Sequence, residues 1–575
     1  MLREYIREAS GKCLGSIGEA SGRRRESTGK VRGEHWGMHQ LDTAATKSEP
    51  GKLTRFYLWG AAALAVLPRL PTLNATMLAP SGEYHFAVMG RAILQGQLPY
   101  DGGFDHKPLG MPYLTALFSW LFGPTALAVH LLGLCAVFIS AWMLARIAAL
   151  HAPRSSLPAG SIALAYGLLS LKFGGVETQT ELLFCAPMLS ALALFLETRR
   201  REGSQRTANF AIGALVASAL QINYLAATSI AGCALALLGL QVWRGIDRST
   251  LKRGMSMLWW WLLGALAATA LLFSPYCFRG DLAAYFDAQV RFLRIYHLAT
   301  PWQVQLHQLW GYTASLTVVV VAGIGFSLAA ARGGMRAKAI DREQADVIAA
   351  ALGGSLGALL GAFASGRMVA HYFIPLVPPL LLLLWCTAER YAQAGRRRVR
   401  VTVIVLLAIT VGLSVAALRI SAQATLAQWR GGYQGSHADL QGKIADDIGN
   451  RPGHPPQSAW VLADSQSAMA ISYLSRSQPA NWLSYPAHYL DPKVTAAFGT
   501  SPQHELQVLF AAQPDFVVVG RGRYAPAAQY GAVSPAVLES FTTALTRDYT
   551  QARDYPDLAV GDGFVVYRRR TVDAD

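Results

Sequence analysis

Long apolar segments separated by short polar loops dominate the first 420 residues of the chain. Segments long enough, or nearly long enough, to cross a membrane lie at about 54–70, 125–148, 157–173, 182–197, 208–222, 225–243, 256–276, 311–331, 347–366, 372–389 and 401–419. A shorter apolar segment covers 109–123. This pattern predicts an α-helical polytopic membrane protein with about 11 spans, within a range of about 11 to 13.

Positive charge clusters in short loops that alternate with these apolar segments. The most basic loops cover 199–206, 244–253, 332–342 and 390–400. Loops rich in Lys and Arg remain in the cytoplasm, so the stretches on the other side, 71–108, 174–181, 277–310 and 367–371, are expected to face outward. The chain must then cross the membrane an odd number of times between residue 108 and the basic segment 146–154. We therefore interpret 109–123 as an interfacial or re-entrant helix.

The two ends of the chain differ from the apolar middle. Residues 1–50 are polar and basic, which predicts a disordered cytoplasmic tail before a transmembrane domain at 51–420. After residue 420, the strand-like runs AWVLAD, DFVVVG and GFVVYR alternate with helical stretches at 467–477, 502–512 and 534–548. This alternation predicts a small α/β domain at 421–575, and the count of crossings places that domain outside the cytoplasm.

The composition agrees with a membrane protein and argues against two other classes. Of 575 residues, 52% are hydrophobic and 15% are charged, whereas soluble proteins carry about 25% charged residues. The net charge of +16 does not indicate nucleic-acid binding, because the basic residues lie in short loops without interleaved aromatic side chains. The six cysteines form no CxxC pair, so the sequence indicates neither a zinc site nor a disulfide framework.

Ionisable residues are concentrated in three of the outward stretches, and such concentrations at a membrane surface indicate function. They are Glu83, His85, Arg91, Asp105, His106 and Lys107 in 80–108, Glu177 and Glu181 in GGVETQTE, and Arg367 and His371 in SGRMVAHYF. The spacing of the two glutamates predicts that they share one helical face. Structural alternatives remain: Glu83 stabilises the start of an amphipathic helix over 84–95, the glutamate pair begins another helix, and Arg367 and His371 anchor the chain to lipid headgroups.

Four segments together resemble a known superfamily. They are EYHFAVMGRAILQGQLPY at 83–100, FDHKP at 104–108, ETQTELL at 177–183 and RMVAHYFIPLVPPLLLL at 367–383. In order and spacing, over roughly 54–420, the chain resembles the GT-C membrane glycosyltransferases, in particular the protein mannosyltransferase and aminoarabinose transferase group. The first segment is the specific one.

This resemblance implies a GT-C fold and a defined reaction. A sugar would pass from a polyprenyl-phosphate donor to a hydroxyl of a glycan, lipid or protein acceptor, with inversion, on the outer side of the cytoplasmic (inner) membrane. Membrane lipids surround such an enzyme, and no nucleic acid, metal or cofactor is expected. The donor is a substrate that carries no nucleotide, so no nucleotide-binding motif is required.

The resemblance also implies roles for individual residues. Glu83 and Asp105 are the candidate catalytic carboxylates, with Glu83 favoured as the base that takes the acceptor proton. Cations and hydrogen-bond donors would stabilise the leaving phosphate; the candidates are Arg91, Lys107, Arg367 and His371. The candidates for contact with the acceptor or the sugar are His85, His106, Glu177, Glu181 and Tyr372.

One position departs from the family pattern. Gly82 stands where most relatives carry the acid usually assigned as base. Three explanations stay open: Glu83 acts as the base, Asp105 or a glutamate of the 174–181 loop replaces it, or the chain is a non-catalytic relative that binds lipid-linked sugars or partners in envelope assembly. A transporter is disfavoured, because no span carries a midplane charge pair or a broken repeat in matching halves.

Overall fold

The computed structural model describes most of the chain after residue 51. The described residues are 52–75, 82–101, 105–151, 159–201, 205–279, 282–296, 301–311, 342–366, 368–393, 437–449, 458–477, 485–527, 533–557 and 562–570, with the single residues 401, 408, 412, 419 and 483. Pro50–Asp575 form one compact unit. The expected tail 1–50 and almost all of the expected spans 311–331 and 401–419 lie outside the described residues.

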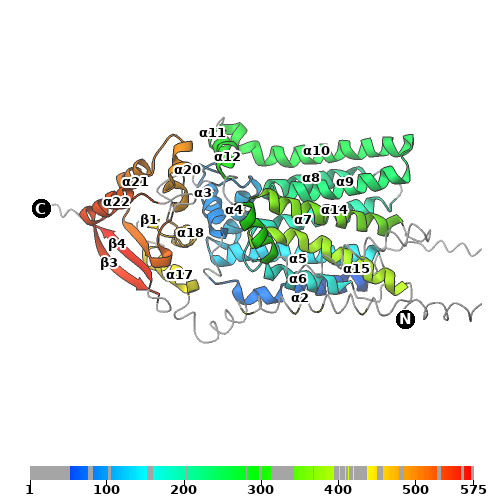
Figure 1. Ribbon diagram of the computed structural model, residues 1–575, viewed down its shortest axis with the longest axis horizontal. Coiled ribbons are helices and arrows are strands. Elements are labelled where there is room, and N and C mark those ends of the chain that lie inside the picture. Colours follow the sequence, from blue (N-terminus) through cyan, green and yellow to red (C-terminus); the bar gives the residue numbers. More distant parts are fainter. Residues whose placement is uncertain are drawn as a thin grey trace, which may run out of the picture. The chain divides into compact units, whose positions relative to one another are not determined.

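A bundle of apolar helices forms the larger part of this unit (Figure 1). Five of the described helices are long and apolar enough to cross a membrane: α5 (Ala126–His151), α7 (Thr180–Thr198), α9 (Ala226–Arg244), α10 (Arg248–Arg279) and α14 (Arg342–Ala364). Shorter bundle helices are α2 (Lys52–Val66), α6 (Gly160–Lys172), α8 (Arg206–Ile222) and α15 (Val377–Gln393). Their length and apolar character make this a membrane protein.

Glycines let the bundle helices approach closely. A Cβ added to Gly353 on α14 would lie 2.1 Å from the backbone oxygen of Gly232 on α9, and the reverse is also true. Membrane helices commonly associate through small residues of this kind. The glycine-rich run 353–366 is therefore a surface for helix packing.

Helices α3 (Glu83–Leu94) and α4 (Gly110–Phe122) lie together at one end of the bundle (Figure 1). Every residue from Glu83 to Ala92 is buried, so neighbouring elements enclose both the polar and the apolar face of the amphipathic helix that the sequence predicts over 84–95. Its contact with α4 is close, because a Cβ on Gly90 would lie 2.5 Å from the Ala116 amide nitrogen. At 13 residues, α4 is about 20 Å long, less than the roughly 30 Å of a bilayer core.

Short helical turns connect the bundle helices near α3. They are η1 (Leu67–Thr72), α11 (Ala283–Phe286), the π-helical turn η2 (Asp287–Arg291), α12 (Phe292–Tyr296) and the 3-10 turn η3 (Ala370–Leu376). Pro375 and the prolines that follow it explain why the chain enters α15 through a 3-10 turn, since proline cannot donate an intrahelical hydrogen bond.

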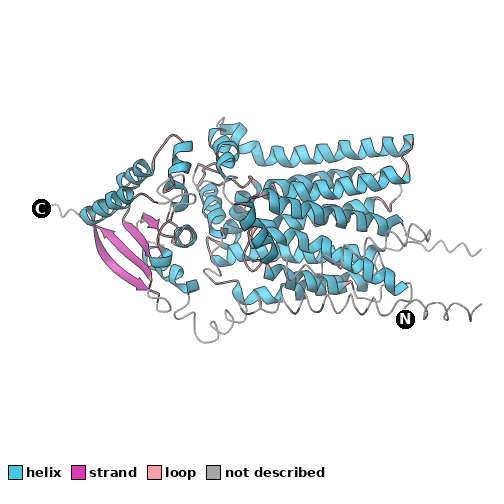
Figure 2. Ribbon diagram, in the orientation of Figure 1, coloured by secondary structure: helices cyan, strands magenta, loops and turns pink. Residues whose placement is uncertain are grey.

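The C-terminal part contains a mixed sheet (Figure 2). Its strand order is β1-β2-β4-β3, with β1 (Ala459–Leu462) parallel to β2 (Phe516–Arg521), and β4 (Gly563–Arg569) antiparallel to both β2 and β3 (Tyr549–Pro556). Side chains alternate between the two faces. Trp460 and Leu462 pack with α21 (Pro502–Ala511) and α22 (Pro535–Asp548), while Val461 packs with α17 (His437–Ile448) and α18 (Ser465–Leu474).

The three strand-like runs and the three helical stretches expected from the sequence form β1, β2, β4, α18, α21 and α22. The sequence did not predict β3, because only its first and seventh residues are buried and it has no apolar alternation. It also did not predict α17, α19 (Pro486–Tyr489) or α20 (Pro492–Ala497). The outward location of this part remains a prediction.

Candidate active site

The segment Asp105-His106-Lys107 forms a tight turn between α3 and α4. The Asp105 carboxylate accepts the backbone N–H groups of His106 and Lys107, the latter at 3.2 Å. Aspartate commonly stabilises a turn through bonds of this kind to its own following backbone. The aspartate of the Asp-His-Lys-Pro sequence therefore stabilises this turn locally.

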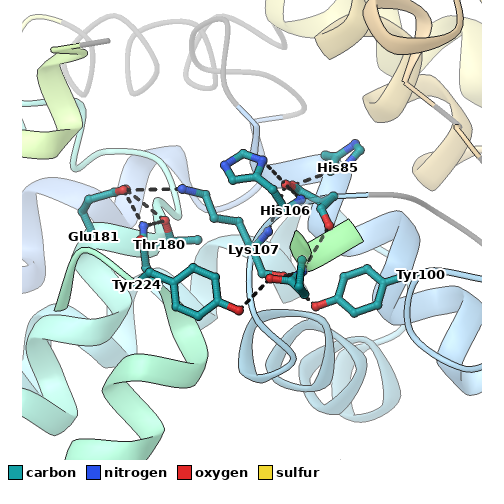
Figure 3. Close-up of polar contacts among 10 residues, drawn as sticks. His85, Tyr100, His106, Lys107, Thr180, Glu181 and Tyr224 are labelled. Atoms are coloured by element: carbon teal, nitrogen blue, oxygen red, sulfur yellow. Dashed lines mark hydrogen bonds and ion pairs between the residues drawn. The ribbon is translucent and has the colours of Figure 1, made fainter. Parts of the chain in front are cut away.

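Two histidines flank the Asp105 carboxylate (Figure 3). Oδ1 lies 2.8 Å from Nδ1 of His106, and Oδ2 lies 3.3 Å from Nε2 of His85, which α3 supplies. Burial alone would raise the pKa of the Asp105 carboxyl, but the charges of His106 and His85 outweigh it and hold that pKa well below its usual range. Asp105 is therefore an ionised, hydrogen-bonded carboxylate.

The backbone of this turn is held from two other directions. The Tyr100 hydroxyl donates to the Lys107 carbonyl at 2.6 Å, and Gln289 on η2 donates to the same carbonyl at 3.0 Å. The Tyr224 hydroxyl in turn donates to Gln289 Oε1 at 2.7 Å. Tyr100 has a φ of +73°, a left-handed conformation that costs a non-glycine residue about 1–2 kcal/mol. Such strain is typical of functional turns.

The Lys107 side chain points to a buried carboxylate at the start of α7 (Figure 3). Its Nζ lies 3.9 Å from Oε1 of Glu181, whose side chain is 0% exposed. From η3, Nε2 of His371 lies 4.0 Å from Oε2 of the same carboxylate. Asn223 also donates to Oε1 at 2.7 Å, and Thr180 donates to Oε2 at 3.0 Å. One anion thus holds an ammonium and an imidazole side by side.

Tyr372 closes this cluster beside the lysine. The Lys107 ammonium lies 5.8 Å from the centre of the Tyr372 ring, and the ring packs edge-on against His371 at 4.8 Å. A cation over an aromatic face is stabilised by the ring quadrupole. Arg367, the other cation predicted for this region, lies outside the described residues.

Arg91 does not join the cluster, which contradicts its predicted role in phosphate binding. It lies on α3, and its guanidinium donates to the backbone carbonyls of Ser472, at 2.7 Å, and Tyr473, at 3.0 Å, and also to that of Ser477. It is 6% exposed. Arg91 therefore joins α3 to the end of α18, because its guanidinium N–H groups donate to backbone carbonyls at that end.

Glu83 occupies a separate buried position at the start of α3. Its Oε1 lies 3.3 Å from Nε2 of His130 on α5, and its Oε2 accepts the Thr178 backbone N–H at 2.8 Å. Its side chain is 0% exposed. Both oxygens thus face protein donors, so Glu83 is less available to an acceptor hydroxyl than its predicted role as base requires.

Glu177 and Glu181 do not share a helical face, so that prediction is wrong. Helix α7 begins only at Thr180, because Gln179 is extended, with φ −78° and ψ +146°. Glu177 therefore lies in the preceding loop, where Gln179 donates to its Oε2 at 2.7 Å. Glu181 is the member of the pair whose carboxylate lies near Lys107, at 3.9 Å.

The C-terminal part contributes aromatic residues that the sequence did not indicate. The His85 ring packs edge-on against Tyr485 at 4.8 Å, and Phe292 lies 4.9 Å from His488 and 5.9 Å from His106. These contacts border the Asp105 turn. Their segment, SYPAHYLDP, has no motif that would have identified it, since ring contacts across distant sequence leave no local pattern.

The structure thus joins most of the predicted residues into one network. Its members are His85, Asp105, His106, Lys107, Glu181, His371 and Tyr372, with Tyr100, Asn223, Tyr224 and Gln289 added by the fold. Among the described residues, no group of three His, Cys, Asp or Glu side chains is arranged to hold a metal ion.

Several solved structures have a fold similar to that of this chain. ArnT from Cupriavidus metallidurans bound to undecaprenyl phosphate superposes with a TM-score of 0.56 and 15% identity, over 90% of this chain and 98% of ArnT. Apo ArnT superposes with a TM-score of 0.53 and 16% identity, over 89% of this chain and 97% of ArnT. This chain has the GT-C fold.

The arabinofuranosyltransferase AftD from Mycobacteria also superposes on this GT-C chain. Its TM-score is 0.51 and its identity is 16%, over 92% of this chain and 40% of AftD. No protein-family model matches the sequence. No curated protein matches it either. The predicted fold is thus confirmed, and the chemistry must be argued from the residues of this chain.

Proposed function

We propose that this protein transfers a sugar from a polyprenyl-phosphate donor to an acceptor hydroxyl on the outer side of the cytoplasmic membrane. The observation that carries the proposal is the convergence of Lys107 and His371 on the buried Glu181 carboxylate. A leaving phosphate needs positive charge and hydrogen-bond donors positioned in advance. The fold supports the proposal, because ArnT, which superposes along nearly its whole length, was solved with undecaprenyl phosphate.

Asp105 is the carboxylate we assign as base in place of the missing acid at position 82. As the acceptor oxygen attacks the anomeric carbon, Asp105 takes the hydroxyl proton and the bond from the anomeric carbon to the phosphate oxygen breaks. The negative charge that develops on the phosphate is stabilised by Lys107 and His371. The donors around Asp105 keep it ionised and able to accept a proton, at a cost in base strength.

Glu83 is the alternative base and is less favoured by the geometry. The oxygens of both carboxylates have protein partners, and Asp105 is preferred because it belongs to the network that contains Lys107. Inversion at the anomeric carbon is proposed from the family chemistry, and a donor and acceptor screen is needed to identify the sugar and the acceptor.

The test is reconstitution of the full chain in liposomes with a panel of radiolabelled polyprenyl-phosphate sugars and a membrane extract as acceptor. The wild type should transfer label from one of them. Lys107→Met should reduce transfer at least about a hundredfold, the size of effect seen when a group stabilising the transition-state charge is removed. Lys172→Met, which changes another lysine near the same end of the bundle, serves as the matched control.

The outcomes separate the candidate functions. Binding of a polyprenyl-phosphate sugar without transfer or hydrolysis would favour the non-catalytic relative. Transfer that is unaffected by Lys107→Met would exclude the proposed phosphate site while leaving the activity itself established.

A further inference from the structure

Glu83 and His130 form a buried pair whose proton content can be deduced from hydrogen-bond geometry. His130 is 4% exposed and Glu83 is 1% exposed. Nδ1 of His130 lies 3.0 Å from the Leu73 carbonyl, which can only accept, so Nδ1 carries a hydrogen. Nε2 of the same ring lies 3.3 Å from Glu83 Oε1.

This arrangement requires one additional proton between the two side chains. A neutral His130 protonated at Nδ1 presents a lone pair at Nε2, and an ionised Glu83 presents another lone pair at Oε1. Two buried acceptors facing each other repel, so the contact is favourable only if the glutamate is protonated or the imidazole is positively charged. The other carboxyl oxygen cannot relieve this requirement, because it accepts the Thr178 amide at 2.8 Å.

We propose that Glu83 and His130 share a single proton and act as a positioning pair for the transfer reaction. The pair fixes the first turn of α3 to α5 and to the 174–180 loop. Thr178 strengthens the same junction, because its hydroxyl donates to the Val129 carbonyl at 2.7 Å. His85, two residues after Glu83, is thereby held at 3.3 Å from Asp105.

Other titratable or charged groups lie on the elements packed around this pair. They are Arg69 on η1, Tyr84 and His85 on α3, Asp105 in the following turn, Glu177 beside Thr178, and Tyr473 on α18. Arg69 is held away from the pair by its own partners, since it donates to the carbonyls of Gly167 and Gly175 and to the Ser170 hydroxyl.

The positioning role rests on the proposed function, and Glu83→Gln distinguishes it from a role as base. The side-chain amide introduced by this substitution can donate to Nε2 of His130 while its oxygen accepts the Thr178 N–H, so the junction is preserved without a shared proton. We expect Glu83→Gln to lose less than about fivefold in transfer rate. Glu83→Ala and His130→Ala should each lose at least about tenfold, because each leaves a buried polar group without its partner.

A second measurement does not depend on catalysis. The unfolding temperature of the wild type in nanodiscs should fall as the pH rises from about 6 to about 10, across the range in which a histidine loses its proton. Glu83→Gln should show a smaller fall, because it has no shared proton to lose. Leu132→Ala, which truncates a buried apolar residue of the same helix, should lower the unfolding temperature without changing its pH dependence.

The possible results decide between the alternatives. Equal pH dependence of unfolding in the wild type and in Glu83→Gln would overturn the shared proton. A loss of a hundredfold or more in Glu83→Gln, with an unchanged unfolding temperature, would make Glu83 the base and overturn the positioning role. If the wild type transfers no sugar, the proposed function fails, and the unfolding experiment still decides whether the pair shares a proton.

Discussion

Lys107 Nζ lies 3.9 Å from Oε1 of Glu181, and the glutamate is the fully buried partner of the two. A buried carboxylate is stable only if charges and hydrogen bonds compensate for its loss of hydration. Asn223 and Thr180 supply hydrogen bonds, Lys107 supplies the positive charge, and the His371 imidazole lies 4.0 Å from Oε2. In the proposed reaction, a donor phosphate would compete with Glu181 for the same ammonium.

This competition predicts the behaviour of Glu181→Gln. The amide keeps the shape of the side chain but removes the negative charge, so the Lys107 ammonium and the His371 imidazole are no longer held at one carboxylate. We expect kcat/KM for the donor to fall about 10- to 100-fold, within the range for a group that positions charge at a reacting centre. Initial-rate measurements over a range of donor concentrations will check this.

Glu177→Gln is the matched control for that experiment. Glu177 lies in the same loop and is also buried, but its Oε2 accepts a hydrogen bond from Gln179 and does not hold Lys107. An equal loss of kcat/KM in Glu181→Gln and Glu177→Gln would show that both substitutions act by disturbing the folded loop and not by releasing Lys107.

Asp105→Asn tests the assigned base. We expect a loss of at least about 100-fold in kcat, at the general-base scale. Since the pKa of Asp105 lies well below its usual range, the carboxylate is ionised at every working pH, and the ratio of wild-type to variant rate should stay constant between about pH 5 and about pH 8. A ratio that declines steadily towards acid pH would contradict this assignment.

The same depressed pKa has a consequence for stability. A carboxyl that is more acidic in the folded than in the unfolded state stabilises the fold above its unfolded pKa of about 3.9, and this contribution is lost as the pH falls through the folded value. The difference in unfolding temperature between the wild type and Asp105→Asn should therefore persist at neutral pH and shrink only below about pH 4. Thermal unfolding in nanodiscs over this pH range measures it.

Gly82→Asp restores the acid that most relatives carry. Gly82 is the N-cap residue of α3 with φ −80°, and among the described residues a Cβ there would meet only Phe86, at 3.9 Å. The aspartate therefore fits, and its effect on the free energy of unfolding should stay within about 0.5 kcal/mol, since Asp and Gly are both tolerated caps. If Asp105 is the base, transfer should change less than about threefold. Gly82→Asn is the uncharged control, and a tenfold gain found only in the aspartate variant would show that position 82 limits the reaction.

Arg91→Met tests the structural reassignment of this arginine. The substitution removes the buried guanidinium bonds to the carbonyls of Ser472, Tyr473 and Ser477, so the unfolding free energy should fall by about 2–4 kcal/mol. The donor KM of the folded fraction should stay within about twofold. Arg547→Met, which changes an arginine with a 71% exposed side chain, is the control, and a large rise in donor KM in Arg91→Met would restore its predicted place at the phosphate.

The sequence predicted the helices of the bundle well, because a membrane segment must be apolar along its whole length and charges must collect in its loops. It also predicted that Asp105, His106 and Lys107 belong to the candidate site. These residues are consecutive and shortly precede α4, so their proximity needs no contact between distant segments. The prediction failed for Glu177, because the spacing of four residues assumes a helix and the extended Gln179 delays the start of α7.

The remaining differences come from contacts between distant segments. The partners of Arg91 are backbone carbonyls, which every residue carries and which no sequence pattern distinguishes. His130 lies inside a long apolar helix, where a single histidine gives no indication of a carboxylate partner on α3. Gln289 holds the Lys107 carbonyl, and Tyr224 in turn holds Gln289; only the fold brings these residues together.

The bond from Arg91 to Ser472 spans 381 positions of the chain. Translation proceeds from the N-terminus, so α3 is synthesised long before the segment that accepts its guanidinium. Until then, Arg91 must find other acceptors or remain hydrated. Maturation of the site is therefore expected to be a late, post-insertion event, and a nascent chain stalled before residue 472 would contain the whole Asp-His-Lys turn without the support that α18 provides.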